Sequence, residues 1–307
     1  MHKLESQTYK SKLQTSSEDF KKNKDSMLGM LQEIDLLLDE AEAGGGPDHH
    51  ERLAARGKLP VRERIFHFLD PDSPFLEISG LAGYKSDYPV GGGAVAGVGV
   101  CSGIECIIFA NDPTVLAGAM HFYSVKKWMR AMAIARDCKI PFIQFVESAG
   151  GDLRPRSGQV VGGTTHFAES GRQFYEITEL SKLNIPTVTV TFGTATAGGA
   201  YQPGMSDYNI FVKDQADVAL AGPPLVQMAT GEISSREDIG GAKMHAEKSG
   251  LAEYLAEDDL DGIRIAREVM SHLNWKKEGN LPRFKIKDPL YDQEDLLGIV
   301  EPSLKTP

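Results

Sequence analysis

Two glycine-rich segments, each placed directly after a short apolar run, are the residues of this sequence best suited to chemistry. The run Pro141–Val146 leads into Ser148–Gly151, and the run Pro186–Phe192 leads into Ala197–Ala200. Runs of β-branched and aromatic residues bounded by Pro and Gly predict buried strands, and glycine after a strand lets the backbone approach a ligand closely. We therefore expect peptide N–H groups from both loops to face one anion, such as a thioester oxyanion or enolate, without an ionisable side chain.

Each glycine loop also has a purely structural interpretation, the close packing of a helix against a strand. The segment Ala197–Ala200 is expected to begin a helix, because Pro203 is tolerated in a first turn. A helix N-terminus presents unpaired N–H groups and a partial positive charge, which favours a binding role. One loop alone decides neither interpretation, but two loops at neighbouring strand ends favour a shared binding site.

Side-chain nucleophiles and bases are the main alternative to this backbone chemistry. Ser148, His166 and Asp152 have the residue types of a hydrolytic triad, but the sequence lacks the Gly-x-Ser-x-Gly motif that presents such a serine. Glu147 is a candidate general base if it is partly buried, and a hydrogen-bonded structural role is the other interpretation. The sequence therefore favours backbone N–H groups over an acid–base pair.

Two further segments are candidates for binding a phosphorylated ligand. Gly91–Gly97 (GGGAVAG) lacks the Gly-Lys-Ser/Thr ending of a P-loop, and it precedes an apolar run, which predicts a flexible lead-in to a strand. Arg56, Lys58, Arg62 and Arg64 form a basic cluster in an acidic chain. This cluster is interpreted either as a solvated surface or as a binding site for phosphate groups.

Neither the cysteines nor the histidines have the spacing of a metal site. Cys101, Cys106 and Cys138 include no pair with C-x-x-C spacing, which argues against a zinc ribbon and a disulfide framework. His121 and His245 each lack a second ligand at i+4. We expect no metal in this protein.

The composition limits the class of protein. The 307 residues are 41% hydrophobic and 25% charged, which is typical of a globular protein with one large domain or two small ones. The formal net charge of -10 disfavours general affinity for nucleic acid. No apolar stretch approaches the roughly 20 residues that span a membrane, and the N-terminus lacks the apolar core of a signal peptide. We expect a cytoplasmic protein, in preference to one of the mitochondrial matrix.

Alternating strands and helices are expected to position the two glycine loops. Hydrophobic periodicity and Gly/Pro boundaries predict these elements. Their alternation predicts an α/β fold with parallel strands, in which ligands bind beyond the carboxyl ends of strands. The predicted helices are Ser26–Ala43, Arg62–Leu69, Ser124–Cys138, His166–Leu183 and Leu260–Leu273, and the predicted strands are the hairpin of Ala94–Val100 and Ile104–Ala110, then Pro141–Val146, Thr187–Phe192, Tyr208–Val212 and Asp217–Ala221.

Long segments of the sequence resemble one family, the carboxyltransferase (β) subunits of biotin-dependent acyl-CoA carboxylases of the methylcrotonyl-, geranyl- and propionyl-CoA type. The resemblance runs from about residue 50 to residue 305. The segments that carry it are Arg56–Ile65 (RGKLPVRERI), Phe109–Val115 with Gly118, Val146–Pro155 (VESAGGDLRP), Gly193–Val212 (GTATAGGAYQPGMSDYNIFV), Ala221–Glu232 and Asp238–Asp259.

This resemblance implies a crotonase-like α/β fold, a spiral of ββα units. Full-length members carry two such domains, and this chain is similar to the first, N-terminal one. The implied domains are an N-terminal helical extension at 1–48, an acyl-CoA-binding domain at 49–286, and a linker at 287–307 into an absent C-terminal biotin-binding domain. The expectation is a piece of a longer protein or one half of a split protein, and either puts independent catalysis in doubt.

The resemblance also implies a reaction, the transfer of CO2 from carboxybiotin to an acyl-CoA enolate that is stabilised by backbone amides. The expected catalytic groups are the amides of Gly150, Gly151, Gly198 and Gly199. The residues expected to contact the coenzyme A thioester are Arg56, Lys58, Lys126, Ala149, Ala197 and Ala200.

The implied partners are an acyl-CoA, a biotin carboxylase and a biotin carrier subunit. The Met-Lys-Met type of attachment motif is absent from this sequence, so biotin is expected on a separate carrier protein. Full-length members form hexamers, which implies a homo-oligomer. The alternatives are a biotin-dependent acyl-CoA decarboxylase subunit, a biotin-independent hydratase or isomerase with Glu147 as base, and a non-catalytic CoA-binding assembly subunit.

Two segments bear on the substrate, one by its similarity to some members and one by its departure from the family. The segment Ala221–Val226 (AGPPLV) is more similar to methylcrotonyl- and geranyl-type members than to propionyl-type members. In the first loop, Gly151–Arg154 (GDLR) replaces the usual Gly-Ala-Arg or Gly-Ala-Phe of the family. Because that loop is implied to lie near the acyl group, we expect an unusual substrate.

Overall fold

The computed structural model describes residues 10–152, 154, 167–277 and 288–301. The chain divides into two compact units, one of residues 40–279 and one that combines residues 1–39 with 280–307. Among the described residues, no helix is long and apolar enough to cross a membrane. The larger unit contains every residue for which we predict a role in binding or catalysis.

The smaller unit contains most of α1 (Glu18–Ala43) and the short helix η4 (Gln293–Gly298). The helix α1 begins earlier than its predicted start at Ser26, because the Ser17 hydroxyl accepts a hydrogen bond from the Phe20 amide and caps the first turn. Phe20 is buried against Gly298, where a Cβ would lie 2.3 Å from its ring.

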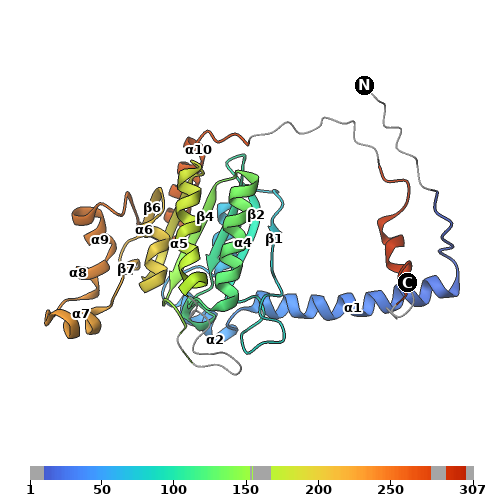
Figure 1. Ribbon diagram of the computed structural model, residues 1–307, viewed down its shortest axis with the longest axis horizontal. Helices are drawn as coiled ribbons and strands as arrows, with labels where there is room; N and C mark the ends of the chain where they lie inside the picture. The colour runs from blue at the N-terminus through green and yellow to red at the C-terminus, as the bar shows by residue number, and fades with distance from the viewer. Residues whose placement is uncertain (1–9, 153, 155–166, 278–287, 302–307) are drawn as a thin grey trace. The chain divides into compact units, whose positions relative to one another are not determined.

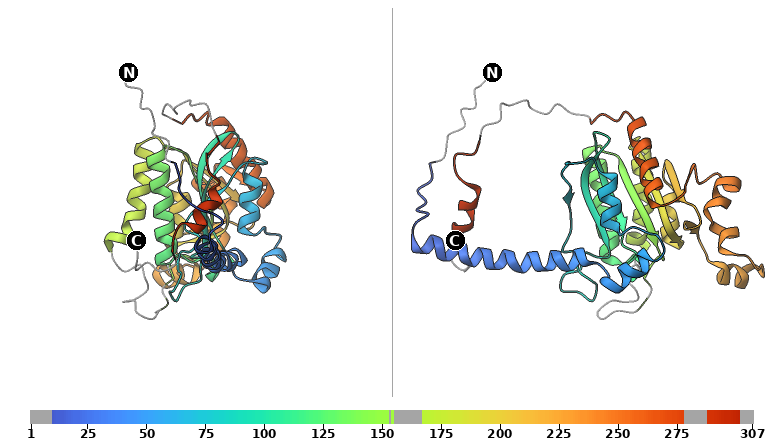
Figure 2. Two further views of the ribbon diagram at one scale, coloured as in Figure 1. Left: turned by 90° about the vertical axis from the view of Figure 1, so that its right-hand side faces the viewer. Right: turned by 180° about the vertical axis from the view of Figure 1, so that it is seen from behind.

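The larger unit is built on one mixed sheet, whose strands lie side by side in Figure 1, and the left view of Figure 2 shows this sheet edge-on between two layers of helices. Within the described residues its strand order is β1-β2-β3-β4-β5-β6-β8, with β7 paired to the end of β5. The first three strands are antiparallel and the rest run parallel. The strands are β1 (Leu76–Glu77), β2 (Ala94–Cys101), β3 (Ile104–Asn111), β4 (Phe142–Ser148), β5 (Thr187–Thr196), β6 (Tyr208–Val212), β7 (Asp217–Ala219) and β8 (Tyr254–Ala256).

Apart from the earlier start of α1, the predicted hairpin, helices and parallel strands are confirmed with ends that differ by at most a few residues. The short elements β1, β8, α2 and α7–α9 are not among those predicted. In the larger unit the helices are α2 (Pro47–Ala54), α3 (Val61–Phe68), η1 (Leu116–Gly118), α4 (Phe122–Cys138), α5 (Phe167–Lys182), η2 (Ala197–Ala200), α6 (Tyr201–Gly204), α7 (Pro223–Thr230), α8 (Arg236–Gly240), α9 (Ala242–Met244), η3 (His245–Ser249) and α10 (Asp259–His272).

Both faces of the sheet are apolar, because helices cover each of them. On β3, Ile107 and Phe109 pack under α4 and α5, whereas Ile108 and Ala110 pack under α3 and α10. Figure 2 shows α10 on the face opposite to α4 and α5. Strands buried on both faces are expected to be apolar throughout, as in parallel sheets of α/β proteins. This three-layer arrangement places the carboxyl ends of β3, β4 and β5 at one edge.

The glycine triplet before β2 is a buried turn, which corrects the prediction of a flexible lead-in. Gly91, Gly92 and Gly93 have φ values of 87°, 66° and 63°, a left-handed run that side chains would strain. The buried Lys127 ammonium donates to the carbonyls of Gly91 at 3.2 Å and Ala94 at 2.7 Å. The lysine therefore holds both ends of the turn.

This buried lysine is expected to make stability depend on pH. Burial is the main cause that lowers the pKa of Lys127 from 10.5 to about 8. Because the folded-state pKa lies below the unfolded one, the folded chain binds fewer protons in this window and stability rises with pH. Between about pH 7 and about pH 10, the free energy of unfolding of the wild type should gain about 2–3 kcal/mol relative to Lys127→Met. Denaturant titrations of both proteins would measure this, and a difference independent of pH would contradict it.

Candidate active site

The two glycine loops lie side by side at the carboxyl ends of β4 and β5. Ser148 at the end of β4 pairs with Ala195 of β5. A Cβ on Gly150 would lie 3.0 Å from the Thr196 carbonyl oxygen, and one on Gly199 would lie 3.4 Å from the Ser148 Cβ. Each loop therefore has a glycine where the other loop approaches closely, and the structure brings both predicted loops into one place.

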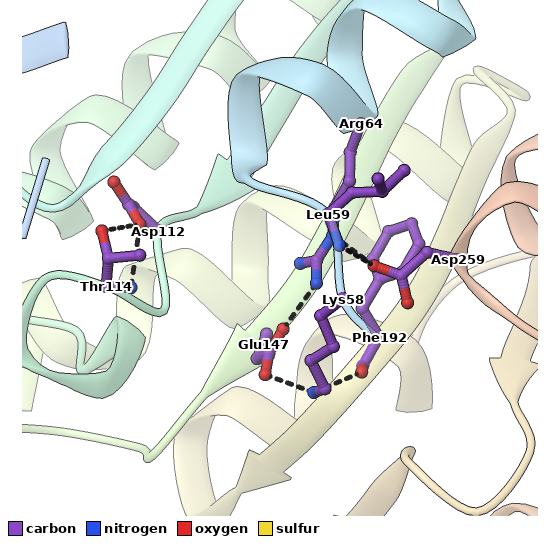
Figure 3. Close-up of polar contacts among 8 residues, drawn as sticks. All are labelled: Lys58, Leu59, Arg64, Asp112, Thr114, Glu147, Phe192 and Asp259. Carbon is purple, nitrogen blue, oxygen red and sulfur yellow. Dashed lines mark hydrogen bonds and ion pairs between the residues drawn. The ribbon is translucent and has the colours of Figure 1, made fainter. Parts of the chain in front are cut away.

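A third segment, residues 112–121 after β3, joins these loops and was not predicted to do so. The Ala149 amide donates to the Ala117 carbonyl at 3.1 Å, and the Met120 amide donates to the Gly150 carbonyl at 2.7 Å. Asp112 organises the start of the segment, since its Oδ1 accepts from the Thr114 amide at 2.9 Å and from the Thr114 hydroxyl at 2.5 Å (Figure 3). The local sequence signals for this third segment are Asp112 and Gly118, which follow a predicted strand.

Strained backbone gathers where these three segments meet. Leu116, Ala117 and Ala197 have φ values of 52°, 53° and 52°, the left-handed region that costs an L-residue roughly 1–2 kcal/mol. Such residues persist only where the surrounding structure holds them, and they are common at functional sites. The side chains of Ala117, Ala149 and Ala197 are exposed. A methyl group covers little backbone, so a ligand can approach the peptide groups of all three segments here.

The hydrogen bonds distinguish among the four predicted amides. The Gly150 amide donates to the Ser148 hydroxyl at 3.2 Å. Met120 bonds to the residues on either side of Gly151, so the Gly151 N–H points away from that partner. In η2 the first i→i+3 bond runs to the N–H of Gly199, which leaves the Gly198 N–H without a partner inside the helix. Gly151 and Gly198 are thus the better donors to a ligand.

The remaining predicted contact residues differ in exposure. Ala149 and Ala197 are exposed beside the glycines, whereas Ala200 is 7% exposed and packs in the apolar cluster with Val146 and Phe211. Arg56 follows α2 and is exposed. Lys126 is exposed on α4, with its ammonium 4.2 Å from the centre of the Phe122 ring.

A network of four charged side chains lies where β4 and β5 lead into the loops (Figure 3). Arg64 donates through Nη2 to Glu147 Oε2 at 3.0 Å and through Nε to Asp259 Oδ2 at 2.9 Å. Lys58 donates to Glu147 Oε1 at 2.5 Å and to the Phe192 carbonyl at 2.9 Å. The network joins α3, β4, β5 and α10, and its two cations balance its two carboxylates.

The network changes the interpretation of the basic cluster. Arg64 is buried and the Lys58 side chain is only 9% exposed, and both bind carboxylates. Arg62 binds Glu77 through two hydrogen bonds of 2.6 and 3.2 Å. A phosphate at Lys58 would have to replace a buried carboxylate. Arg56 is the member of the cluster whose side chain is exposed.

The geometry does not favour the alternative mechanisms that use a side-chain base, a hydrolytic triad or a metal ion. Glu147 is 8% exposed and both of its oxygens face cations, so it is placed to hold β4 and not to take a proton from a ligand. The Ser148 hydroxyl accepts from the Gly150 amide, and His166 lies outside the described residues. His245 is engaged by Ser249 and the Val218 carbonyl. Among the described residues, no group of three or more His, Cys, Asp or Glu side chains is arranged to hold a metal ion.

Comparisons with known proteins identify the family of this chain. Residues 52–307 match the family model described as the carboxyl transferase domain. A probable biotin-dependent acyl-coenzyme A carboxylase beta2 subunit of Mycobacterium tuberculosis is 49% identical over 282 residues, which cover 92% of this chain and 52% of that protein. The mitochondrial methylcrotonoyl-CoA carboxylase beta chain of Dictyostelium discoideum is 40% identical, covering 94% of this chain and 49% of that protein. The beta subunit of P. aeruginosa geranyl-CoA carboxylase has a crystal structure that matches with a TM-score of 0.86 and 39% identity, covering 97% of this chain and 55% of that one.

The chain therefore belongs to the carboxyl transferase domain family. The predicted resemblance and the crotonase-like α/β fold are both confirmed. The chain spans about half the length of the curated relatives it matches.

Proposed function

We propose that this chain is the acyl-CoA-binding half of a biotin-dependent carboxyltransferase. The observation that carries the proposal is the meeting of three loops at the carboxyl ends of neighbouring strands, with exposed alanines, with the Gly151 N–H directed away from Met120 and with the Gly198 N–H outside the hydrogen bonds of η2. Two such N–H groups suit the oxygen of a thioester, which becomes negatively charged when the α-carbon, or the γ-carbon of an α,β-unsaturated acyl group, loses a proton. The chain's own contribution is to bind the thioester and to stabilise that oxygen.

The residues of this site are better suited to binding a thioester than to catalysis by an ionisable acid or base. The exposed alanine side chains leave room for the flat thioester group, and the proposed polar contacts are backbone donors. Carboxybiotin, brought by a separate carrier protein, supplies the activated CO2. Arg56 and Lys126, both exposed, are the proposed contacts for the phosphates of coenzyme A.

A branched or unsaturated acyl group of the methylcrotonyl or geranyl type is the proposed substrate class. The similarity to relatives named for methylcrotonoyl-CoA and geranyl-CoA supports this choice. The first loop differs from the family at Gly151–Arg154. There Arg154 donates to the buried Asp152 carboxylate through Nε at 2.7 Å and through Nη2 at 3.1 Å. That pair fixes the loop next to Gly151, so it is expected to limit the acyl group on this side.

Calorimetric titration of the chain with coenzyme A and with acetyl-, propionyl-, methylcrotonyl- and geranyl-CoA tests the proposal. Binding of an acyl-CoA is expected in the wild type, and Ala149→Phe should weaken it at least about tenfold, a loss of about 1.4 kcal/mol. The matched control is Ser271→Phe, on an exposed site of α10 at the opposite edge of the sheet. No binding in the wild type, or equal binding by all three proteins, would contradict the proposal.

The other functions are separated by simple results. A hydratase or isomerase predicts turnover that Glu147→Gln abolishes, and the pairing of both Glu147 oxygens disfavours it. A non-catalytic assembly subunit predicts binding without transfer after addition of the missing domain and a biotinylated carrier. A decarboxylase would use the same site in the reverse direction. The homo-oligomer, the biotin carboxylase partner, the lack of a metal and the cytoplasmic location stay predictions.

A further inference from the structure

The strands that carry the two glycine loops are out of register just before the loops begin. Val146 pairs with Thr191 and Ser148 pairs with Ala195, so one residue of β4 faces three residues of β5. The residue of β4 is Glu147. Bulges of this kind bend a strand and redirect the residues after the bend, and they are common next to active sites. The geometry of this bulge therefore sets the distance between the two loops.

The Lys58 ammonium joins the two sides of the bulge. It donates to Glu147 Oε1 on β4 at 2.5 Å and to the Phe192 carbonyl on β5 at 2.9 Å. The exposed fractions of the Lys58 and Glu147 side chains are 9% and 11%. Charge-assisted bonds that are shielded from water are strong, so one cation ties the two strand ends to each other.

The next residue of β5 shows how tightly the bulge is packed. A Cβ on Gly193 would lie 2.6 Å from Glu147 Oε1 and 2.7 Å from its Cδ, so the carboxylate rests on the β5 backbone. Further along, the site of a Cβ on Gly150 is 3.0 Å from the Thr196 carbonyl oxygen. Contacts this close leave little freedom between the strands, and a shift at the bulge would move one glycine loop against the other.

We infer that Lys58 is a positioning residue, which holds the two glycine loops at the spacing where their amides face one oxyanion. The inference rests on the proposed function, and it replaces the prediction of Lys58 as a phosphate ligand. Lys58 acts through Glu147 and the Phe192 carbonyl and touches neither predicted donor. Losing it should impair stabilisation of the oxyanion more than binding of the coenzyme A moiety.

Acetoacetyl-CoA is a suitable probe, because its enolate has its own near-ultraviolet absorption and carries the charge that the amides stabilise. The bound enolate-to-keto ratio should exceed that of the free compound with the wild-type chain. In Lys58→Met the bound ratio should fall at least about tenfold, which is about one pKa unit. The affinity for coenzyme A itself should change less than about twofold.

Asp259→Asn is the matched control within the same network. Asp259 bonds to Arg64 and to the Leu59 amide, on the side of the network away from Glu147 (Figure 3). It should lower the free energy of unfolding, yet leave the bound enolate ratio unchanged. If Lys58 had only a structural role, the two variants would shift the ratio alike or not at all, and either result overturns the inference.

A second variant keeps the test decisive if Lys58→Met does not fold. Lys58→Gln retains a donor for the Phe192 carbonyl but loses the charge that faces Glu147. Its bound enolate-to-keto ratio should therefore lie between those of Lys58→Met and the wild type. If Lys58→Met does not fold, the ratio in Lys58→Gln should be several-fold below that of the wild type. An unchanged ratio in the folded Lys58→Gln protein overturns the inference. A wild-type chain that does not bind acetoacetyl-CoA would instead contradict the proposed function, so the two failures are distinguishable.

Discussion

Replacing Arg64 by methionine is expected to lower the free energy of unfolding by about 3–5 kcal/mol, because it leaves buried carboxylates without their shared cation. Arg64 is fully buried, binds both Glu147 and Asp259, and lies with its guanidinium 4.2 Å from the centre of the Phe192 ring. Asp259 would keep only the bond from the Leu59 amide among those found for its carboxylate. Denaturant unfolding followed by circular dichroism would measure the loss.

The same substitution at Arg62 provides the control for Arg64. Arg62 likewise forms an ion pair, with Glu77, but the side chains of Arg62 and Glu77 are 29% and 26% exposed. Water screens such a pair, so Arg62→Met should cost no more than about 1 kcal/mol. Similar losses for the two variants would show that the buried network does not have the energetic role assigned to it.

Replacing Gly118 by alanine is expected to be the second large change, with a loss of about 2–5 kcal/mol in the free energy of unfolding and a loss of acyl-CoA binding. Gly118 has φ 65°, where alanine costs roughly 1–2 kcal/mol. Its Cβ would lie 2.0 Å from the Glu147 carbonyl oxygen, a backbone atom, so the two segments would have to separate at a further cost of about 1–3 kcal/mol. Unfolding and calorimetric binding would measure both effects.

Gly103→Ala is the matched control for Gly118→Ala. Gly103 also has a left-handed backbone, with φ 74°, but a Cβ there would meet no atom within 4 Å. It lies in the turn of the β2–β3 hairpin, at the edge of the sheet opposite to the loops. We expect a loss of roughly 1–2 kcal/mol from the backbone alone and unchanged binding. Equal effects of the two substitutions would contradict close packing of residues 112–121 against β4.

The parts of the fold that the sequence predicts are those set by local patterns. Glycine after an apolar run is a local signal, and it correctly located both loops at strand ends. The hairpin turn at Ser102-Gly103 and the long amphipathic α10 have similarly local causes. The three-residue strand β8 offers no periodicity, so it was missed.

The buried network could not be predicted, because its partners are far apart in the sequence. Lys58 and Glu147 are 89 residues apart, and Arg64 and Asp259 are 195 residues apart. A basic cluster looks the same in the sequence whether its charges face water or buried carboxylates. The left-handed backbone of Leu116 and Ala117 could not be predicted either, because tertiary hydrogen bonds impose a conformation that these residue types disfavour.

The central claim is that the Gly151 and Gly198 amides hold a thioester oxygen, and the vibration of that carbonyl tests it most directly. An isotope-edited infrared spectrum of an acyl-CoA with a labelled thioester carbonyl, bound to the chain, would report the hydrogen bonds on its oxygen. Two converging donors polarise the carbonyl, so we predict a band at lower frequency than in water, and the loss of this band in Ala149→Phe. A bound thioester whose carbonyl band stays at its position in water would contradict the account.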